Sequence, residues 1–372
     1  MIGFNVPPYI GTEMKYIEEA VAKNHKICGD GPFTKRCNAW LEKKTGTAKA
    51  LLTTSCTHAT EMAALLADIK EGDEIIMPSY TFVSTADAFV LRGAVPVFVD
   101  IRPDTMNIDE NKIEAAITEK TKAIVPVHYA GVSCEMDKIM ELAEKYHLTV
   151  IEDAAQGIMS TYKGRALGTI GDYGCFSFNG NKIITTSGGG MLVCNLPEEK
   201  AKERVAKVRF WSTQAREKAR HYEHKEIGYN YRMSNIVAGI GRGQLKVLDE
   251  RIAQKRHIFA YYQEYLGDLE GISFMPMHEN ERPNCWLSVI ELSDDCPVKP
   301  LDVMVALEQG DIESRPVWKP MHLQPVFAGC DYIDNGEVGK YLFEHGVCLP
   351  SDTKMTDADL ERICDIIRGL WK

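Results

Sequence analysis

Short apolar runs alternate with amphipathic segments between residues 49 and 155. The apolar runs are KALLTTSC, EIIMPSY, VPVFVDI, KAIVPVHYA and LTVIEDAA, in that order. Between them, apolar residues recur at helical spacing most clearly over 60–69 and 135–147. Near-continuous apolar strands separated by helices are typical of a mostly parallel sheet that is covered on both faces. The pattern therefore predicts an α/β domain.

The regions on either side of this segment carry other helical patterns and shorter strands. The glycines and the proline of CGDGPFTK predict a loop near the N-terminus. We predict a large domain over residues 1–250, which holds the parallel sheet, and a smaller α+β domain over residues 251–372. The expected helices are 13–23, 197–220, 245–266, 300–309 and 357–370, and the expected strands are MLVCN, WLSVIEL and DIESRPV.

The composition narrows the class of protein. The 372 residues are 45% hydrophobic and 26% charged, without a low-complexity tract or a repeat, which excludes a disordered chain and a solenoid. The formal charge of -10, with acids and bases interspersed, argues against a nucleic-acid surface. The chain shows no signal peptide or membrane-spanning stretch, and its eleven cysteines form no C-x-x-C pair. We expect a cytoplasmic protein without a metal site or a membrane partner.

Ligands of such sheets bind beyond the carboxyl ends of the strands, so the residues that follow each predicted strand are candidates for chemistry. Asp153 is one of them. A carboxylate there can bind a metal or a ribose, pair with a cationic ring nitrogen, or cap the next helix, and the pattern leaves these alternatives open. The candidates are Ser55-Cys56-Thr57, Tyr80-Thr81-Phe82, His128-Tyr129 and Asp153-Ala154-Ala155-Gln156.

Two further segments carry candidate chemistry. In TTSCTHATEMAALL, small hydroxyl residues separate a strand from a helix, so the N–H groups of Cys56 and Thr57 form either a phosphate cradle or an ordinary helix cap. In CFSFNGNKIITTSGGGML, Lys182 follows Ser177 in a loop between two strand-like runs. A lone lysine is usually a solvated surface residue. An apolar setting without neighbouring charge instead lowers the lysine pKa and frees the amine for Schiff-base formation.

Together these segments supply a phosphate seat, an acidic partner for a pyridine nitrogen and an imine-forming lysine. Pyridoxal 5'-phosphate (PLP) needs all three. The acid keeps the ring nitrogen protonated, and the lysine moves a proton between the substrate and cofactor carbons. Phe82, after another strand, is placed to stack on the ring, although a bare aromatic residue more often belongs to the core.

Over essentially its whole length, the sequence resembles the DegT/DnrJ/StrS family of sugar aminotransferases. The resemblance rests on S-F-x-x-x-K at Ser177–Lys182 and E-D-A-A-Q at Glu152–Gln156. It implies the aspartate-aminotransferase fold type I, with a mostly parallel, seven-stranded type of sheet between helices and a smaller α+β domain. It also implies a homodimer with shared active sites. By this resemblance Lys182 forms the imine with PLP and Asp153 pairs with the pyridine nitrogen. Gln156 approaches the ring hydroxyl, and Phe82 stacks on the ring. The same resemblance implies that the phosphate is held by Cys56, Thr57 and Ser177, and that Asn230 reaches the phosphate of the neighbouring subunit.

The two halves of the chain resemble different branches of this family. Up to about Phe176, CGDGPFT and YTFVSTADAFVLRGA resemble the dTDP-4-keto-6-deoxyglucose 4-transaminases of surface-antigen synthesis. From Asn179 onward, NGNKIITTSGGGML and ESRPVWKPMHLQPVF resemble the transaminases that make UDP-linked bacillosamine precursors. Both branches aminate C4 of a 4-keto-6-deoxy sugar. We therefore expect transfer of an amino group from glutamate to dTDP-4-keto-6-deoxyglucose, with UDP-2-acetamido-4-keto-2,6-dideoxyglucose as the alternative.

A net-negative protein that binds a diphosphate needs local cations. Arg315, Lys319 and His322 are candidate substrate donors, or equally rim residues of the small domain, and His128 is a candidate substrate contact. His221 and His224, the one close histidine pair, are expected near the sugar pocket or at the surface rather than on a metal. A non-catalytic PLP-binding regulator is the alternative from another class. Its cofactor absorbance would not shift when glutamate is added.

Overall fold

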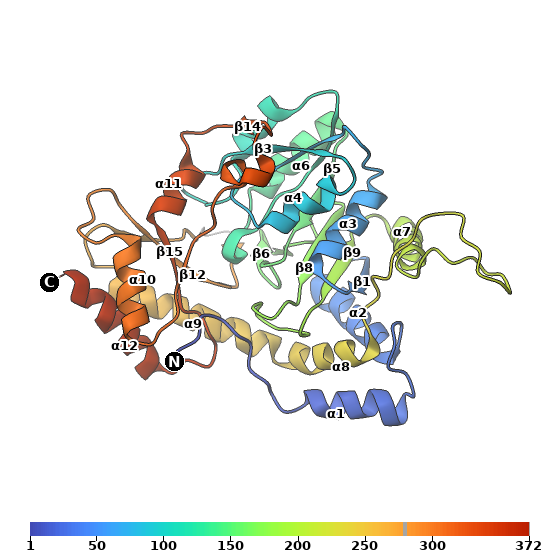
Figure 1. The fold of residues 1–372 in the computed structure, drawn as a ribbon, viewed down its shortest axis with the longest axis horizontal. Coiled ribbons are helices and arrows are strands. Elements are labelled where there is room, and N and C mark those ends of the chain that lie inside the picture. The colour runs from blue at the N-terminus through green and yellow to red at the C-terminus, as the bar shows by residue number, and fades with distance from the viewer. Residues whose placement is uncertain (278–280, 372) are drawn as a thin grey trace.

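The computed structural model describes residues 1–277 and 281–371, and within them its largest feature is an eight-stranded sheet (Figure 1). The strand order is β1-β9-β8-β5-β4-β2-β3-β14. Neighbouring strands run parallel except at β9, which is antiparallel to both β1 and β8. The strands are β1 (Lys49–Thr53), β2 (Glu74–Pro78), β3 (Val95–Val99), β4 (Thr121–Ile124), β5 (Thr149–Asp153), β8 (Tyr173–Ser177), β9 (Gly190–Cys194) and β14 (Tyr332–Ile333).

This sheet confirms the predicted α/β fold class and adds one strand to it. Each of the five apolar runs forms a strand whose side chains are mostly buried, as expected for strands covered on both faces. The additional strand is β14, which comes from the C-terminal region and pairs with β3, with Tyr332 opposite Phe98. Two residues are too short to carry a pattern, so the sequence offered no signal for β14.

Helices cover the sheet in separate packing groups. Apolar residues of α3, α4 and α7 pack together in one core cluster, those of α2 and α8 in a second, and those of α5 and α6 in a third. The helices of this part of the chain are α1 (Glu13–Glu18, continued by a π-helical turn over Glu19–Lys23), α2 (Pro32–Thr45), α3 (Cys56–Leu66), α4 (Val83–Val90), α5 (Glu110–Ile113), α6 (Met136–Tyr146), α7 (Glu198–Trp211) and α8 (Asn235–Gln244).

Several helix boundaries differ from those predicted. Helix α3 begins at Cys56, before the expected start at residue 60, because Ser55 Oγ accepts a hydrogen bond from His58 N at 3.0 Å and caps the first turn. The loop predicted for CGDGPFTK ends early because Pro32 begins α2, where a proline costs no hydrogen bond. Helix α7 ends at Trp211, and the chain beyond it extends away from the molecule as a long loop (Figure 1).

A second sheet lies in the C-terminal part of the chain, with strand order β10-β12-β15-β13. Helices α9, α10 and α12 pack on it around a separate core cluster. A small third sheet has the order β11-β6-β7. The remaining elements are β6 (Thr161–Tyr162), β7 (Arg165–Ala166), α9 (Leu248–Leu266), β10 (Ile272–Phe274), β11 (Glu281–Arg282), β12 (Ser288–Leu292), α10 (Pro300–Gln309), β13 (Arg315–Pro316), α11 (Val338–His345), β15 (Gly346–Leu349) and α12 (Asp357–Arg368).

The division into residues 1–250 and 251–372 stays a prediction, and two segments cross it. The N-terminus pairs with the C-terminal part of the chain, where Ile2 forms a parallel bridge with Ile312 and Phe4 N donates to Glu313 Oε2 at 3.1 Å. In the opposite direction, β14 joins the large sheet. No helix among the described residues combines the length and the apolar character that a membrane crossing requires.

Candidate active site

A cavity of about 320 Å³ opens at the carboxyl ends of β1, β2, β5 and β8. This is the edge of the sheet where the sequence predicted the chemistry to lie. Segments from both parts of the chain form its wall, which consists of Ser55, Cys56, Thr57, Thr60, Thr81, Phe82, Ser84, Thr85, Val127, Asp153, Ala155, Gln156, Ser177, Asn179, Asn181, Lys182, Gly188, Gly189, Trp286 and Trp318.

Lys182 lies in the loop between β8 and β9, and its side chain reaches the cavity wall. Its Nζ lies 4.1 Å from the centre of the Trp286 ring, over the ring face. Burial lowers the pKa of Lys182 to about 8, and the nearby Cys56 and Asp153 offset part of that shift. A substantial fraction of this amine is therefore neutral near pH 8 and can act as a nucleophile.

Asp153 ends β5 and presents its carboxylate to the same cavity. Only 9% of the residue is exposed. Thr85 Oγ1 donates to Oδ2 at 2.7 Å, and Ala155 N donates to Oδ1 at 3.0 Å. Each oxygen thus has one donor that fixes its direction and keeps a lone pair for a further donor from the cavity.

Gln156 is oriented by a backbone contact. Ala130 N donates to Gln156 Oε1 at 2.7 Å, from a turn in which Ala130 has a positive φ of 53°. Since the amide oxygen is engaged, the NH₂ group is left as the donor for the cavity. This geometry suits a contact with a ring hydroxyl or phenolate oxygen.

The first turn of α3 forms one end of the cavity. Cys56 and Thr57 begin this helix, so their N–H groups have no partner within it and attract anions. A Cβ on Gly190 would lie 2.4 Å from Cys56 N, so only glycine lets β9 approach the helix start this closely. Burial, with Asp153 nearby, raises the pKa of the Cys56 thiol and keeps it protonated. The turn therefore presents hydroxyl, thiol and amide donors without a negative charge.

Three aromatic side chains, those of Phe82, Trp286 and Trp318, also line the cavity, and the sequence predicted only the first of them. Phe82 precedes α4 and is 55% exposed, as a ring must be if it is to stack on a ligand. Its ring centre lies 6.2 Å from that of Trp318, whose segment belongs to the C-terminal part of the chain. Trp286 and Trp318 were missed because neither follows a predicted strand of the large sheet.

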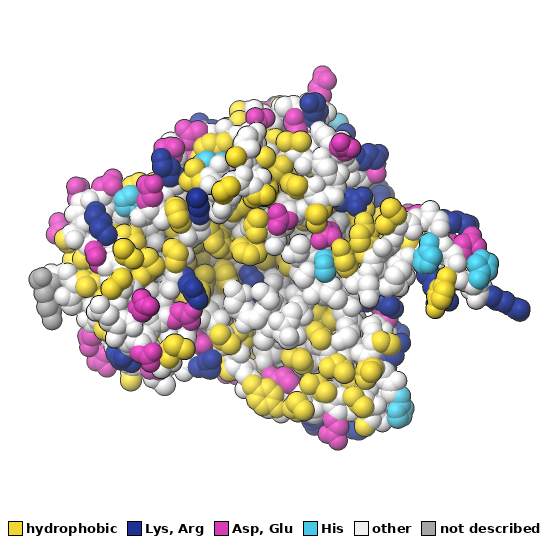
Figure 2. All heavy atoms as spheres, in the orientation of Figure 1, with side chains coloured by type: hydrophobic (Ala, Val, Ile, Leu, Met, Phe, Trp, Pro, Cys, Tyr) yellow, Lys and Arg dark blue, Asp and Glu magenta, His cyan; other side chains and the backbone are white. Residues whose placement is uncertain are grey.

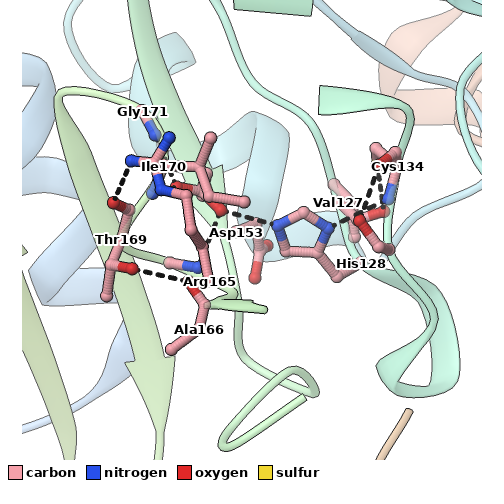
Figure 3. A network of polar contacts seen from close by, with 12 residues as sticks. Val127, His128, Cys134, Asp153, Arg165, Ala166, Thr169, Ile170 and Gly171 are labelled. Carbon is pink, nitrogen blue, oxygen red and sulfur yellow. Dashed lines mark hydrogen bonds and ion pairs between the residues drawn. The ribbon is translucent and has the colours of Figure 1, made fainter. Parts of the chain in front are cut away.

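His128 lies outside the cavity, which corrects the prediction of a substrate contact. It is fully buried, and its Nε2 lies 2.9 Å from Glu152 Oε2. Its Nδ1 accepts from Cys134 N at 3.2 Å, which leaves Nε2 as the donor to Glu152. Figure 3 shows the ring between Cys134 and the Ile170–Gly171 backbone.

Glu152 is the centre of this contact network. The Glu152 carboxylate also accepts N–H donors from Gly168 at 2.7 Å and from Ile170 and Gly171 at 2.6 Å each. With the His128 ring, four donors satisfy this fully buried anion, which faces away from Asp153 because neighbouring side chains of a strand alternate. The unit fixes the end of β5 next to Asp153.

The other predicted substrate contacts lie away from the cavity wall. Arg315 is exposed, forms an ion pair with Glu313 and lines a different groove. Lys319 is exposed and directly follows Trp318. His322 is half-buried, its Nδ1 lies 2.6 Å from Ser79 Oγ, and its ring stacks on a tyrosine.

The remaining predicted residues lie on the long loop after α7. Asn230 is exposed and contributes nothing to the cavity of its own chain. His221 and His224 are also exposed, with His221 paired to Glu223 at 3.0 Å. Within residues 1–277 and 281–371, no group of three or more His, Cys, Asp and Glu side chains is arranged to hold a metal ion.

The cavity fits PLP by the chemistry of its donor set. A helix start with free N–H groups suits a phosphate, a carboxylate with spare lone pairs suits a pyridinium N–H, and an amine of lowered pKa suits an aldehyde. Ser177 Oγ accepts from Asn179 N at 3.3 Å, which leaves its hydroxyl proton free for the phosphate. Fold and site together define a PLP-dependent aminotransferase of fold type I.

Comparisons with known proteins identify the family. The model of the DegT/DnrJ/EryC1/StrS aminotransferase family matches residues 9–368, and the chain belongs to this family. EpsN of Bacillus subtilis, assigned to the pyridoxal phosphate-dependent aminotransferases, is 43% identical over 98% of this chain and 95% of its own length. The GDP-perosamine synthase of Caulobacter vibrioides is 35% identical, over 97% and 96% of the two chains.

A solved structure agrees in fold and cofactor. The PLP form of Spr1654 from Streptococcus pneumoniae, assigned as a sugar aminotransferase, superimposes with a TM-score of 0.90. The two chains are 26% identical, and the match covers 99% of this chain and 97% of the other. The predicted family, fold class and cofactor are thereby confirmed.

Proposed function

We propose that this enzyme transfers the amino group of glutamate to C4 of a nucleoside-diphosphate-linked 4-keto-6-deoxyhexose. The observation that carries the proposal is the convergence of Lys182, Asp153 and the first turn of α3 on one cavity. Bound PLP supplies an aldehyde and an electron-accepting ring. Membership of a family whose relatives include GDP-perosamine synthases supports a nucleotide sugar as the acceptor.

Nine of the cavity residues have a role in the proposed reaction. Cys56, Thr57 and Ser177 hold the cofactor phosphate, and Asp153 holds the proton on the ring nitrogen. Gln156 donates its amide N–H to the ring hydroxyl, and Phe82 packs on the ring face. Lys182, once released as a free amine, delivers a proton to one face of the sugar carbon. Trp286 and Trp318 line that side of the cavity and shield it from water.

The proposal also concerns which nucleotide carries the sugar substrate. The first half of the chain favours a dTDP sugar, and the second half favours a UDP-2-acetamido sugar. The relatives named as GDP-perosamine synthases add a third nucleotide. Trp318 and the exposed Lys319 next to it place an aromatic face and a cation in one segment. Such a pair suits a sugar ring and its diphosphate.

We also propose a cytoplasmic homodimer that shares its active sites. Hydrophobic side chains gather over α1 and α8 on the face shown in Figure 2. Those on and near α1 include Met14, 61% exposed, and Val21, 50% exposed. The loop after α7 extends from the molecule (Figure 1), and we expect Asn230, which pairs with Thr213 where the loop returns, to contact the neighbouring subunit. All eleven cysteines are free thiols, which suits a reducing compartment.

A product assay tests the function. Holoenzyme and glutamate are incubated with the 4-keto-6-deoxyhexose of dTDP, of GDP, and with UDP-2-acetamido-4-keto-2,6-dideoxyglucose, and the sugar products are identified by mass spectrometry and NMR. We expect a 4-amino sugar from at least one acceptor, with the dTDP sugar preferred. A cofactor absorbance that glutamate does not shift would indicate a PLP-binding regulator and overturn the proposal. Amination at another carbon would overturn the assignment of C4.

A further inference from the structure

A second lysine is buried in the molecule, and no step of the proposed reaction uses it. Lys255 lies on α9 and is 1% exposed. Its Nζ donates to Asn5 Oδ1 at 2.6 Å, to Trp286 O at 3.0 Å and to Ser351 O. An ammonium group has three N–H bonds, so these oxygens use its full capacity. Lys255 thus joins three segments that are distant in sequence.

Two of these segments continue to the loop of Lys182. Asn5 Nδ2 donates to Asn181 O at 2.8 Å, and Trp286 Nε1 donates to the same oxygen at 2.8 Å. Asn181 directly precedes Lys182, and the Trp286 ring lies against the Lys182 amine. Both the peptide beside the active amine and the ring beneath it are therefore held by groups that Lys255 holds.

The Lys182 loop needs such external contacts. Residues 178–189 between β8 and β9 form turns and bends without a helix or strand. The segment that carries Trp286 is equally irregular, and α9 fixes it twice, since the neighbouring Arg256 donates through Nε to Pro283 O at 2.7 Å. Two consecutive basic residues of one helix thus fix the segment on which the Trp286 ring depends.

We propose that Lys255 is a positioning residue, which through Asn5 and Trp286 sets the place of the Lys182 amine. The inference rests on the proposed function of Lys182 and deepens it. A displacement of about 1 Å at a reacting group can cost about 10²-fold in rate, so a remote contact of this kind has a measurable catalytic effect. Lys255 itself touches neither substrate nor cofactor.

The test uses the Lys255→Met holoenzyme, in which methionine fills the same space without donors. We expect kcat to fall by about tenfold to 10²-fold, with KM for glutamate changed by less than about twofold. The pH midpoint of the visible absorbance change should move to lower pH by about half a unit, because the ring no longer supports a cation at Lys182. Lys138→Met is the matched control, because Lys138 is an exposed lysine paired with Glu141 at 3.2 Å.

A double-mutant cycle with Asn5→Leu separates positioning from general destabilisation. If Lys255 acts through Asn5, the two substitutions together should lower kcat little more than either alone. Purely additive effects, or an unchanged kcat and pH midpoint in both single variants, would overturn the inference. Should Lys255→Met fail to fold, Asn5→Leu and Trp286→Phe, which keeps a ring but loses the donor to Asn181, carry the same test. Loss of the proposed function is recognised separately, by a Lys182→Ala protein that keeps its turnover.

Discussion

The two buried lysines of this protein differ in what surrounds their amines. Burial lowers the pKa of Lys182 to about 8 and that of Lys255 to about 7. The Lys255 amine is enclosed by oxygen acceptors, whereas the Lys182 amine lies on an aromatic face beside a cavity. A lowered pKa therefore reports burial, and chemistry requires in addition an open side and a free electron pair.

The largest expected effect comes from removing the amine that faces the cavity. Lys182→Ala should lower kcat by more than about 10⁴-fold, since in the proposed reaction the residue serves both as nucleophile and as proton donor. PLP binding should survive in part, because the phosphate and ring contacts remain. Steady-state turnover with glutamate and the keto sugar, beside equilibrium dialysis of PLP, measures both. A kcat within tenfold of that of the parent enzyme would contradict the assignment of Lys182 as the reactive lysine.

The Asp153 carboxylate lines the same cavity as Lys182 and is the second group whose removal should have a large effect. Asp153→Asn keeps the shape of the side chain but removes the charge that, in the proposed reaction, holds a proton on the ring nitrogen. We expect kcat to fall by about 10²-fold to 10³-fold, the range for one electrostatic partner at a reacting group. Thr85→Val, which removes only the donor to Asp153 Oδ2 at 2.7 Å, should cost much less. Equal losses in the two variants would mean that orientation, rather than charge, is what Asp153 provides.

The sequence predicted the residues around Lys182 that line the cavity, and it did not predict the contacts that enclose Lys255. Lys182, Asp153 and Cys56 were found because each follows a strand-like run or lies in a local motif, so a few neighbouring residues carry the signal. Lys255 gave no signal because its partners Asn5, Trp286 and Ser351 lie up to 250 residues away. Contacts of that range arise only from the folded topology.

The same reason explains the other differences between prediction and structure. His128 follows a predicted strand as the true cavity residues do, yet its ring turns to Glu152 instead of the cavity. Side-chain direction at a strand end depends on the register and twist of the sheet, which a single sequence does not specify. Trp318 reaches the cavity only because the C-terminal segment folds back onto the large sheet, where Met321 N donates to Ser79 O at 2.7 Å.

Substitution of Lys255 should lower stability more than substitution of Lys182, although Lys182 matters more for activity. Lys255→Met leaves three buried oxygens without a donor and should lower the free energy of unfolding by about 2–3 kcal/mol. Lys182→Met removes an amine that has no oxygen acceptor among residues 1–277 and 281–371, and it should change the free energy of unfolding by less than about 1 kcal/mol. Denaturant-induced unfolding of both variants measures this free energy. Cofactor-free proteins are used, because bound PLP would add its own stabilisation. A greater loss of stability in Lys182→Met would contradict the description of the two sites.

The smallest expected effect is one of pH, and it tests access directly. With a pKa of about 8, the neutral fraction of Lys182 rises from about one tenth at pH 7 to about nine tenths at pH 9. The rate at which cofactor-free protein captures added PLP should therefore rise about tenfold over this interval and level off above it. Burial lowers the pKa of Lys255 still further, to about 7, but its amine is enclosed by three oxygen acceptors. Borohydride reduces the imine between a lysine and PLP, and peptide mapping then locates the labelled residue. Of these two lysines, only Lys182 should carry the label. A label on Lys255 would show that its amine becomes accessible in solution.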